Sequence, residues 1–316
     1  MNFTFNKFYL SLTLLLLLVS INTYAQPLNK ITHYQPTRFA CYNSANLLRI
    51  VIRSYDLNSK PYYLVVNPNT FITENIPAIT CKTATLATSE LLATPYMRAL
   101  IHYTSPPYLL DNYGMSHAAQ AVNGVFLTID MCPARKPFET DFFNTLVKLS
   151  DKYQQPMPIA VAISGLWIIN HPDEFNWLIK QSQENKLQIT WINHTFTHVY
   201  YRDRPLAENF LLVPHTNASY EILANEKLLL EHGLTPSVFF RFPGLISNET
   251  LVLKLRQYSL IPIATNAWLA KDQQAKPGSF ILVHGNSNEP EGIKKVLPLL
   301  QNLHYHWLPL NAAFEK

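Results

Sequence analysis

Short apolar runs alternate with helically spaced apolar positions from residue 123 to the end of the chain. Each run is short and bounded by polar residues, as a buried strand is. The predicted strands are residues 125–129, 159–163, 187–192, 238–241, 261–264 and 280–284. The predicted helices are residues 142–153, residues 173–183 with Asp173 as the N-cap, and residues 220–232, which Gly233 ends.

A strand–helix repeat of this kind predicts parallel strands with the helices packed outside them. A glycine-rich phosphate loop after the first strand would indicate a doubly wound sheet, and residues 130–135 contain no glycine. We therefore predict an α/β fold of the distorted (β/α) barrel type over residues 123–316.

Residues 26–122 have a different pattern and carry no catalytic motif. Residues 48–52 and 62–66 are β-branched and aromatic runs bounded by Asn and Pro, which predicts strands. Residues 105–107 and 111–114 have the composition of a loop or linker. The prediction is a small β-rich accessory region in front of the barrel.

The first 25 residues have the order of a secretory signal peptide. Lys7 precedes an apolar stretch at residues 8–21, and Thr23-Tyr24-Ala25 supplies small residues for cleavage after Ala25. The alternative is an uncleaved anchor helix, but a bilayer-spanning helix needs about 20 apolar residues. We expect export to the periplasm or the exterior, with no stable membrane span after cleavage.

Charge and cysteine content narrow the functional classes. The chain has 316 residues and a net charge of +4 without any long basic run, which argues against nucleic acid as a partner. Disulfides persist in exported proteins, so Cys41 and Cys81 form a bridge or, alternatively, are two buried free thiols. Cys132 is left over and lies in the most informative part of the chain.

Polar groups follow the predicted strands at the end where parallel barrels carry their active sites. They are Asp130, the segment Asn193-His194-Thr195-Phe196-Thr197-His198, the segment Arg241-Phe242-Pro243-Gly244, and His284. His194 and His198 are four residues apart, and on a helical turn that spacing would let both imidazoles bind one metal ion.

These segments, in this order and together with Leu127-Thr128-Ile129-Asp130, resemble the polysaccharide deacetylase family (NodB homology, carbohydrate esterase 4). The resemblance covers residues 123–314, and the two-histidine segment is its most specific part. It implies hydrolysis of an acetyl group on a glycan, a C–N non-peptide bond in the N-acetyl case, with a divalent metal, often zinc.

The resemblance also implies individual roles. His194 and His198 match the metal ligands, Asp130 the general base, Arg241 the residue that orients the base, and His284 the general acid. Contacts with the glycan are expected from residues near the same motifs. These are Phe242, Pro243 and Trp268.

Two departures from the family pattern leave alternatives open. Met131 stands where the family has a metal-binding acid, and Cys132 stands where glycine is usual. Asp130, another acid or a water could complete the metal site, or Cys132 could bind as a thiolate. A lost metal site would instead give a non-catalytic glycan-binding protein. The segment Asn266-Ala267-Trp268 also lacks the acid of the fourth family motif.

Overall fold

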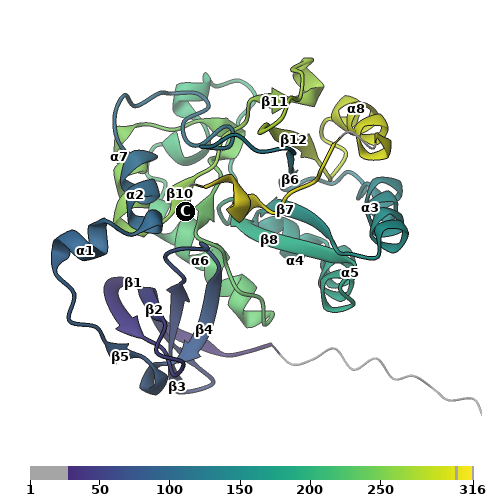
Figure 1. Cartoon of the computed structure of the whole chain (residues 1–316). Coiled ribbons are helices and arrows are strands. Elements are labelled where there is room, and N and C mark those ends of the chain that lie inside the picture. The colour runs from purple at the N-terminus through teal and green to yellow at the C-terminus, as the bar shows by residue number, and fades with distance from the viewer. Residues whose placement is uncertain (1–27, 303–304, 315–316) are drawn as a thin grey trace, which may run out of the picture.

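The computed structural model describes residues 28–302 and 305–314 and contains two β-sheets (Figure 1). The predicted signal peptide lies outside the described residues. One sheet is parallel and has helices packed against it, and the other is antiparallel and comes from the N-terminal region. No helix within residues 28–302 or 305–314 has the length and apolar character to cross a membrane.

The parallel sheet has seven strands in the order β10-β9-β8-β7-β6-β12-β11. Its sequence-order bounds are β6 (Phe126–Met131), β7 (Met157–Ile163), β8 (Leu187–Asn193), β9 (Phe239–Phe240), β10 (Ile261–Pro262), β11 (Ala267–Trp268) and β12 (Phe280–His284). Because β10 and β11 remain edge strands, the curled sheet is an open barrel. The predicted distorted (β/α) barrel is confirmed.

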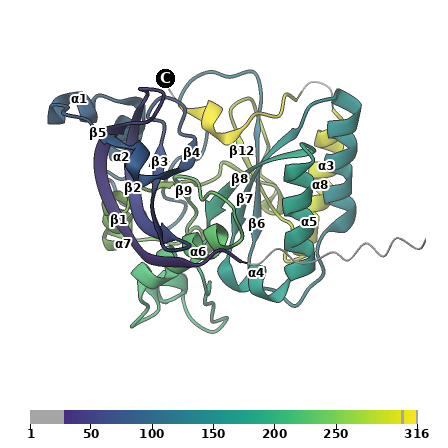
Figure 2. The same ribbon diagram turned by 90° about the horizontal axis from the view of Figure 1, so that it is seen from below.

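Helices cover the outer face of this sheet, and Figure 2 shows α3, α5 and α8 side by side against it. The helices that follow β6 are α3 (Thr140–Tyr153), α4 (Gly165–Asn170), α5 (Pro172–Gln183), α6 (Ala218–Glu231), α7 (Glu249–Gln257) and α8 (Pro290–Gln301). The predicted cap of α5 was wrong. The helix begins one residue earlier with His171 as N-cap, because Pro172 suits the first helical position, where no N–H is needed.

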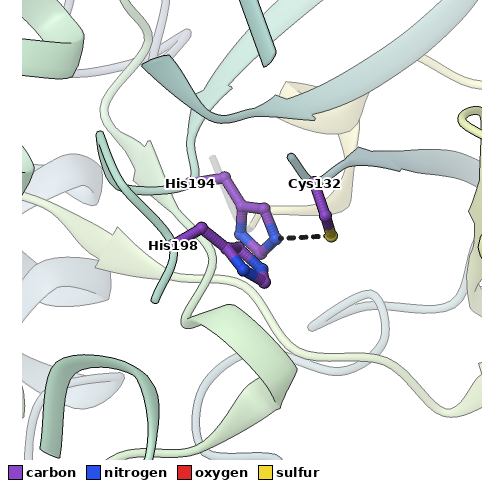
Figure 3. A group of neighbouring side chains, drawn as sticks. All are labelled: Cys132, His194 and His198. Carbon is purple, nitrogen blue, oxygen red and sulfur yellow. Dashed lines mark hydrogen bonds between the residues drawn. The ribbon is translucent and has the colours of Figure 1, made fainter. Parts of the chain in front are cut away.

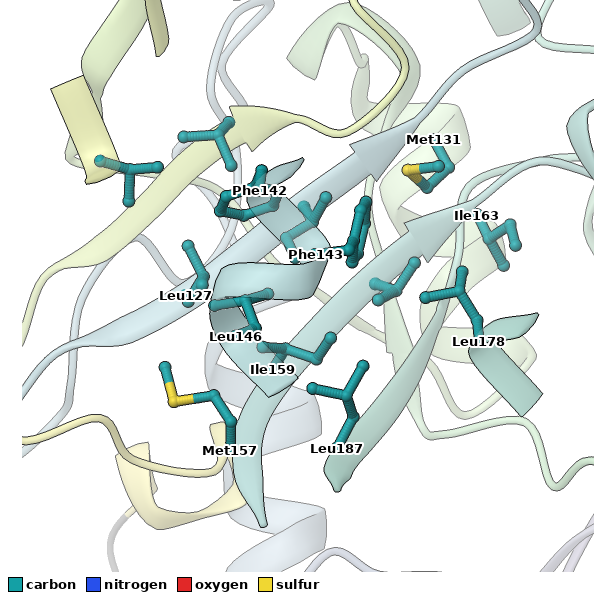
Figure 4. Packing of buried hydrophobic residues seen from close by; sticks show 14 of the residues in the cluster. Leu127, Met131, Phe142, Phe143, Leu146, Met157, Ile159, Ile163, Leu178 and Leu187 are labelled. Atoms are coloured by element: carbon teal, nitrogen blue, oxygen red, sulfur yellow. The ribbon is translucent and has the colours of Figure 1, made fainter. Parts of the chain in front are cut away.

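Side chains along β6 alternate between the two faces of the sheet. Leu127, Ile129 and Met131 point outward into an apolar core shared with α3, α5 and α8 (Figure 4). Thr128 and Asp130 point inward, toward the hollow of the barrel. Met131 is fully buried among apolar neighbours, so its side chain lies on the wrong face to take part in a site inside the barrel.

The N-terminal region forms a five-stranded antiparallel sheet of order β4-β3-β2-β1-β5. Its elements are β1 (Ile31–Tyr42), β2 (Leu48–Leu57), β3 (Lys60–Val66), β4 (Thr73–Pro77), β5 (Lys82–Thr83), α1 (Thr88–Leu92) and α2 (Pro95–His102). The predicted β-rich region is confirmed. So is the predicted Cys41–Cys81 disulfide, with Cα atoms 5.5 Å apart, and the alternative of two free thiols was wrong.

This N-terminal region packs against the inner face of the parallel sheet. One buried apolar cluster joins Ile52 and Met97 of the N-terminal region to Ala160, Ile192 and Phe239 of the parallel strands. The two sheets therefore share a core, and side chains of the N-terminal region fill the hollow of the open barrel.

The segment predicted as a loop or linker runs along the barrel and bridges to it. Isolated β-bridges join Asp111 to Ile246 and Met115 to Ile263, and a third joins His117 to Ser279 near the start of β12. The N-terminal region therefore pairs with residues of the barrel as far along the chain as His117, shortly before β6.

Candidate active site

The structure gathers the predicted polar residues at the C-terminal ends of the parallel strands. Asp130 and His284 are register partners on the neighbouring strands β6 and β12. His194 follows β8, and Arg241 follows β9. Because adjacent parallel strands end at the same edge of the sheet, these four residues meet there although they are far apart in the sequence.

Asp130 forms a buried ion pair with Arg241. The Nη1 of Arg241 donates to Oδ1 of Asp130 at 2.6 Å and to the Thr128 hydroxyl at 2.9 Å. Burial alone would raise the pKa of Asp130, but the charges of Arg241, His194 and His284 together outweigh burial, and the pKa is lowered. The second oxygen, Oδ2, lies 3.8 Å from Nε2 of His194. Asp130 is thus an ionised carboxylate with one oxygen facing the histidines.

His194 and His198 lie on an irregular loop, so the expected helical turn was wrong. Thr195 and His198 have left-handed backbone angles, with φ of 66° and 48°. The two rings still meet, with centroids 4.8 Å apart. Nδ1 of His194 lies 2.9 Å from the carbonyl oxygen of Arg241. That contact places the proton on Nδ1 and leaves the Nε2 lone pair directed at Sγ of Cys132, 3.6 Å away.

The carboxylate of Glu221 on α6 holds this loop. It accepts hydrogen bonds from the backbone N–H of Phe196 at 3.0 Å and of Thr197 at 2.8 Å, and from the Thr197 hydroxyl at 2.6 Å. Sequence analysis missed Glu221, because a glutamate on an amphipathic helix has the usual signature of a solvated face. Its burial beneath the histidine loop shows a supporting role.

Cys132 and the two histidines form a cluster of side chains that could hold a metal ion. Figure 3 shows the three side chains pointing toward one another, and their donor atoms all lie within 4.8 Å of one another. Nε2 of His198 is buried and has no hydrogen-bond partner among the described residues. Burial alone would raise the pKa of the Cys132 thiol, but the charge of His198 and close contacts with His194 and His284 hold it well below the usual value.

One sulfur and two imidazole donors suit a divalent metal ion such as zinc. Zinc takes imidazole nitrogen and thiolate sulfur in tetrahedral sites. Nε2 of His198 and Nε2 of His194 supply the imidazole lone pairs that such an ion needs. Met131 contributes no donor, because its side chain lies in the outer core.

His284 has a carboxylate partner that sequence analysis missed. Its Nδ1 lies 3.0 Å from Oε2 of Glu289, and the same oxygen accepts a hydrogen bond from the Trp268 indole N–H at 2.6 Å. Burial lowers the pKa of His284, but the contacts with Cys132 and Glu289 raise it overall to about 10. Glu289 comes from the loop after β12. The segment Asn266-Ala267-Trp268 lacks the acid of the fourth family motif, and this absence was the one hint that an acid elsewhere could contact Trp268.

The three residues predicted to contact substrate have different surroundings. Phe242 is 2% exposed and packs in an apolar cluster, and Pro243 is also buried. Trp268 is partly exposed, with the Lys271 ammonium 3.4 Å from its ring centroid. Of the other aromatic residues nearby, Tyr200 is 55% exposed. Trp268 and Tyr200 therefore offer surface to a ligand, and Phe242 offers packing.

Comparison with known families and structures gives two kinds of similarity. Residues 32–93, which cover most of the antiparallel sheet and α1, match the family model "RP012 protein N-terminal domain". Among solved structures, the chain is similar to family 4 carbohydrate esterases and deacetylases, all at low sequence identity.

A family 4 carbohydrate esterase from Bacillus anthracis is 17% identical, with 64% of this chain and 87% of that chain covered and a TM-score of 0.45. Bacillus subtilis PdaA, also a family 4 esterase, is 16% identical over 69% and 88% of the two chains, with a TM-score of 0.44. The chitin deacetylase of the fungal pathogen Colletotrichum lindemuthianum is 14% identical over 65% and 92%, with a TM-score of 0.44.

Proposed function

We propose that this protein is a metal-dependent hydrolase that removes acetyl groups from a polysaccharide. The observation that carries the proposal is the meeting of Asp130, His194, His198 and His284 at one edge of the parallel sheet. An ionised carboxylate, a metal-binding donor set and an imidazole acid are the groups that acetyl hydrolysis requires. The ordered sequence motifs that resemble polysaccharide deacetylases support the acetylated glycan as substrate.

The chain's own residues divide the work between them. Asp130 accepts a proton from the attacking water, and Arg241 keeps it ionised and fixes its direction. His284, held by Glu289, donates a proton to the departing amine or alkoxide. His194 and His198 would hold a zinc ion, which would supply Lewis acidity toward the acetyl carbonyl and water. Trp268 offers an indole face on which a sugar ring can stack.

Export is part of the proposal. The predicted signal peptide at residues 1–25 would carry the chain to the periplasm or the exterior, where envelope and extracellular glycans lie. The Cys41–Cys81 disulfide supports this location, because disulfides persist in oxidising compartments. Analysis of the N-terminus of the exported protein tests cleavage after Ala25.

Metal analysis and acetate release together test the activity. The purified chain is assayed on chitooligosaccharide and on peptidoglycan before and after removal of metal with a chelator. We expect bound zinc, acetate release from at least one glycan, loss of activity with the metal and recovery on adding zinc. A protein that binds glycan but releases no acetate and holds no metal would be the non-catalytic relative instead.

A further inference from the structure

A zinc site with two histidines needs a third protein ligand. Three consecutive residues at the end of β6 are the candidates. Met131 occupies the position of the family's acid in the sequence, Asp130 precedes it, and Cys132 follows it. We propose that the Cys132 thiolate is this ligand, which gives a site of one cysteine and two histidines. This inference rests on the proposed function.

Distance supports Cys132. A tetrahedral zinc ion with Zn–S of about 2.3 Å and Zn–N of about 2.0–2.1 Å holds its sulfur and nitrogen ligands about 3.6 Å apart. The Cys132 Sγ lies 3.6 Å from Nε2 of His194. The donor atoms of Cys132, His194 and His198 form one mutually close set, to which Asp130 does not belong.

The surroundings of Cys132 hold it in this position. The side-chain amide of Asn286, in the loop after β12, donates to the carbonyl oxygen of Cys132 at 2.6 Å. Asn286 is fully buried, so the backbone of Cys132 is tied to the neighbouring strand end. Strand alternation turns Met131 outward and leaves Asp130 and Cys132 facing the interior.

Asp130 already has another partner. Arg241 binds Oδ1 of Asp130 at 2.6 Å, and the guanidinium is in turn fixed by the Thr128 hydroxyl and the Ala264 carbonyl. A carboxylate anchored in this way can act as a base on water beside the metal site. With Cys132 as ligand, the metal keeps one anionic protein ligand while Asp130 stays available for proton transfer.

Sulfur also determines which metal the site prefers. Thiolate is a soft ligand that suits zinc and cobalt, whereas manganese and magnesium prefer oxygen. We therefore expect the protein to bind zinc in preference to manganese, and replacement of Cys132 by Asp to reduce that preference.

X-ray absorption spectroscopy of the zinc-loaded full chain tests the ligand directly. One sulfur neighbour at about 2.3 Å is expected. Cobalt-loaded protein should show a thiolate-to-cobalt charge-transfer band. Cys132→Ser should lose both signals and bind zinc at least about 100-fold more weakly, beyond the roughly 10–100-fold loss typical of a residue that only supports a ligand. Asp130→Asn and Met131→Leu are the matched controls, and both should keep the sulfur signal.

A measurement on the wild-type chain guards against a variant that fails to fold. Cys41 and Cys81 are bridged, so Cys132 is the single free thiol of the chain. In urea-unfolded, metal-free protein it should react with a thiol reagent, and in native zinc-loaded protein it should be protected until a chelator is added. Zinc bound without a sulfur neighbour, or zinc affinity unchanged in Cys132→Ser, would overturn the inference while the proposed function stands. A chain that binds no metal at all would overturn both.

Discussion

Two buried arginine–carboxylate pairs contact the parallel sheet, and they differ in whether the carboxylate keeps an oxygen that the protein does not engage. Arg53 of β2 binds Glu226 of α6 through two hydrogen bonds, at 2.7 and 2.9 Å. Arg241 binds Asp130 through one oxygen, at 2.6 Å. In both pairs the arginine is fully buried.

The surroundings of the two carboxylates explain the difference. Glu226 accepts a further hydrogen bond from the Tyr34 hydroxyl at 2.8 Å and a long one from the Asn193 side chain at 3.5 Å. Both of its oxygens are therefore engaged by protein. Asp130 keeps Oδ2 directed at His194. A buried ion pair by itself does not identify a catalytic site. The oxygen of Asp130 that is left available beside His194 is what supports our proposal of a catalytic role for this pair.

The largest expected effect comes from Asp130→Asn. The amide keeps the shape of the side chain but cannot accept a proton from water, so kcat for acetate release should fall by about 10²–10⁴-fold. Glu226→Gln is the matched change in the other pair and should retain most activity in the folded protein. Similar losses of kcat in the two variants would contradict the claim that Asp130 acts in catalysis and Glu226 does not.

Arg53→Met should act on stability. It leaves Glu226 buried without its partner, which typically costs about 3–5 kcal/mol in free energy of unfolding, and the double variant Arg53→Met/Glu226→Met should recover most of that loss. Urea unfolding of the single and double variants measures both values. Lys186→Met is the control, because Lys186 and its partner Asp151 are both exposed and such pairs contribute about 0–1 kcal/mol. An Arg53→Met variant as stable as Lys186→Met would contradict a stabilising role for the buried pair.

Glu289→Gln tests the second carboxylate of the site. A general acid works in its protonated form, and the pKa of His284 is raised to about 10, in part by Glu289. Removing that charge lowers the pKa, so the alkaline limb of the kcat profile should move to lower pH and kcat should fall by about 10-fold. Glu291→Gln, at an exposed position of α8, should leave the profile unchanged. An unshifted alkaline limb in Glu289→Gln would rule out the role of Glu289.

The smallest effect is the pH dependence of stability. The pKa of Asp130 is lowered in the folded protein, against burial, chiefly by Arg241. A carboxyl group of this kind stabilises the fold above its unfolded pKa, and the contribution is lost as pH falls through the folded value. Urea midpoints between about pH 6 and pH 3 should therefore decline more steeply for wild type than for Asp130→Asn. Parallel declines would show that Asp130 does not contribute.

Local sequence patterns predicted the parallel sheet and the strand-end residues because both follow short-range rules. Apolar runs with helices between them predict parallel strands, and polar residues that end those strands meet at one edge. The outward direction of Met131 was also available from the sequence, since Leu127, Ile129 and Met131 follow the period of two in a strand.

The supporting residues were not predictable because their partners are far away in the chain. Glu221 and Glu226 resemble the solvated face of α6, and Arg53 resembles an exposed strand residue. Only the fold shows that the histidine loop covers Glu221 and that Tyr34 and Arg53 of the N-terminal sheet contact Glu226. Glu289 contacts Trp268 and His284, and no local pattern joins the loop after β12 to Trp268.

The core shared by the two sheets has a consequence for inheritance. A gene segment for residues 123–316 alone would encode a barrel whose inner face, with Ala160, Ile192 and Phe239, would be exposed to water. Such a segment would need another cover for this face before it could serve as a free module in a different protein.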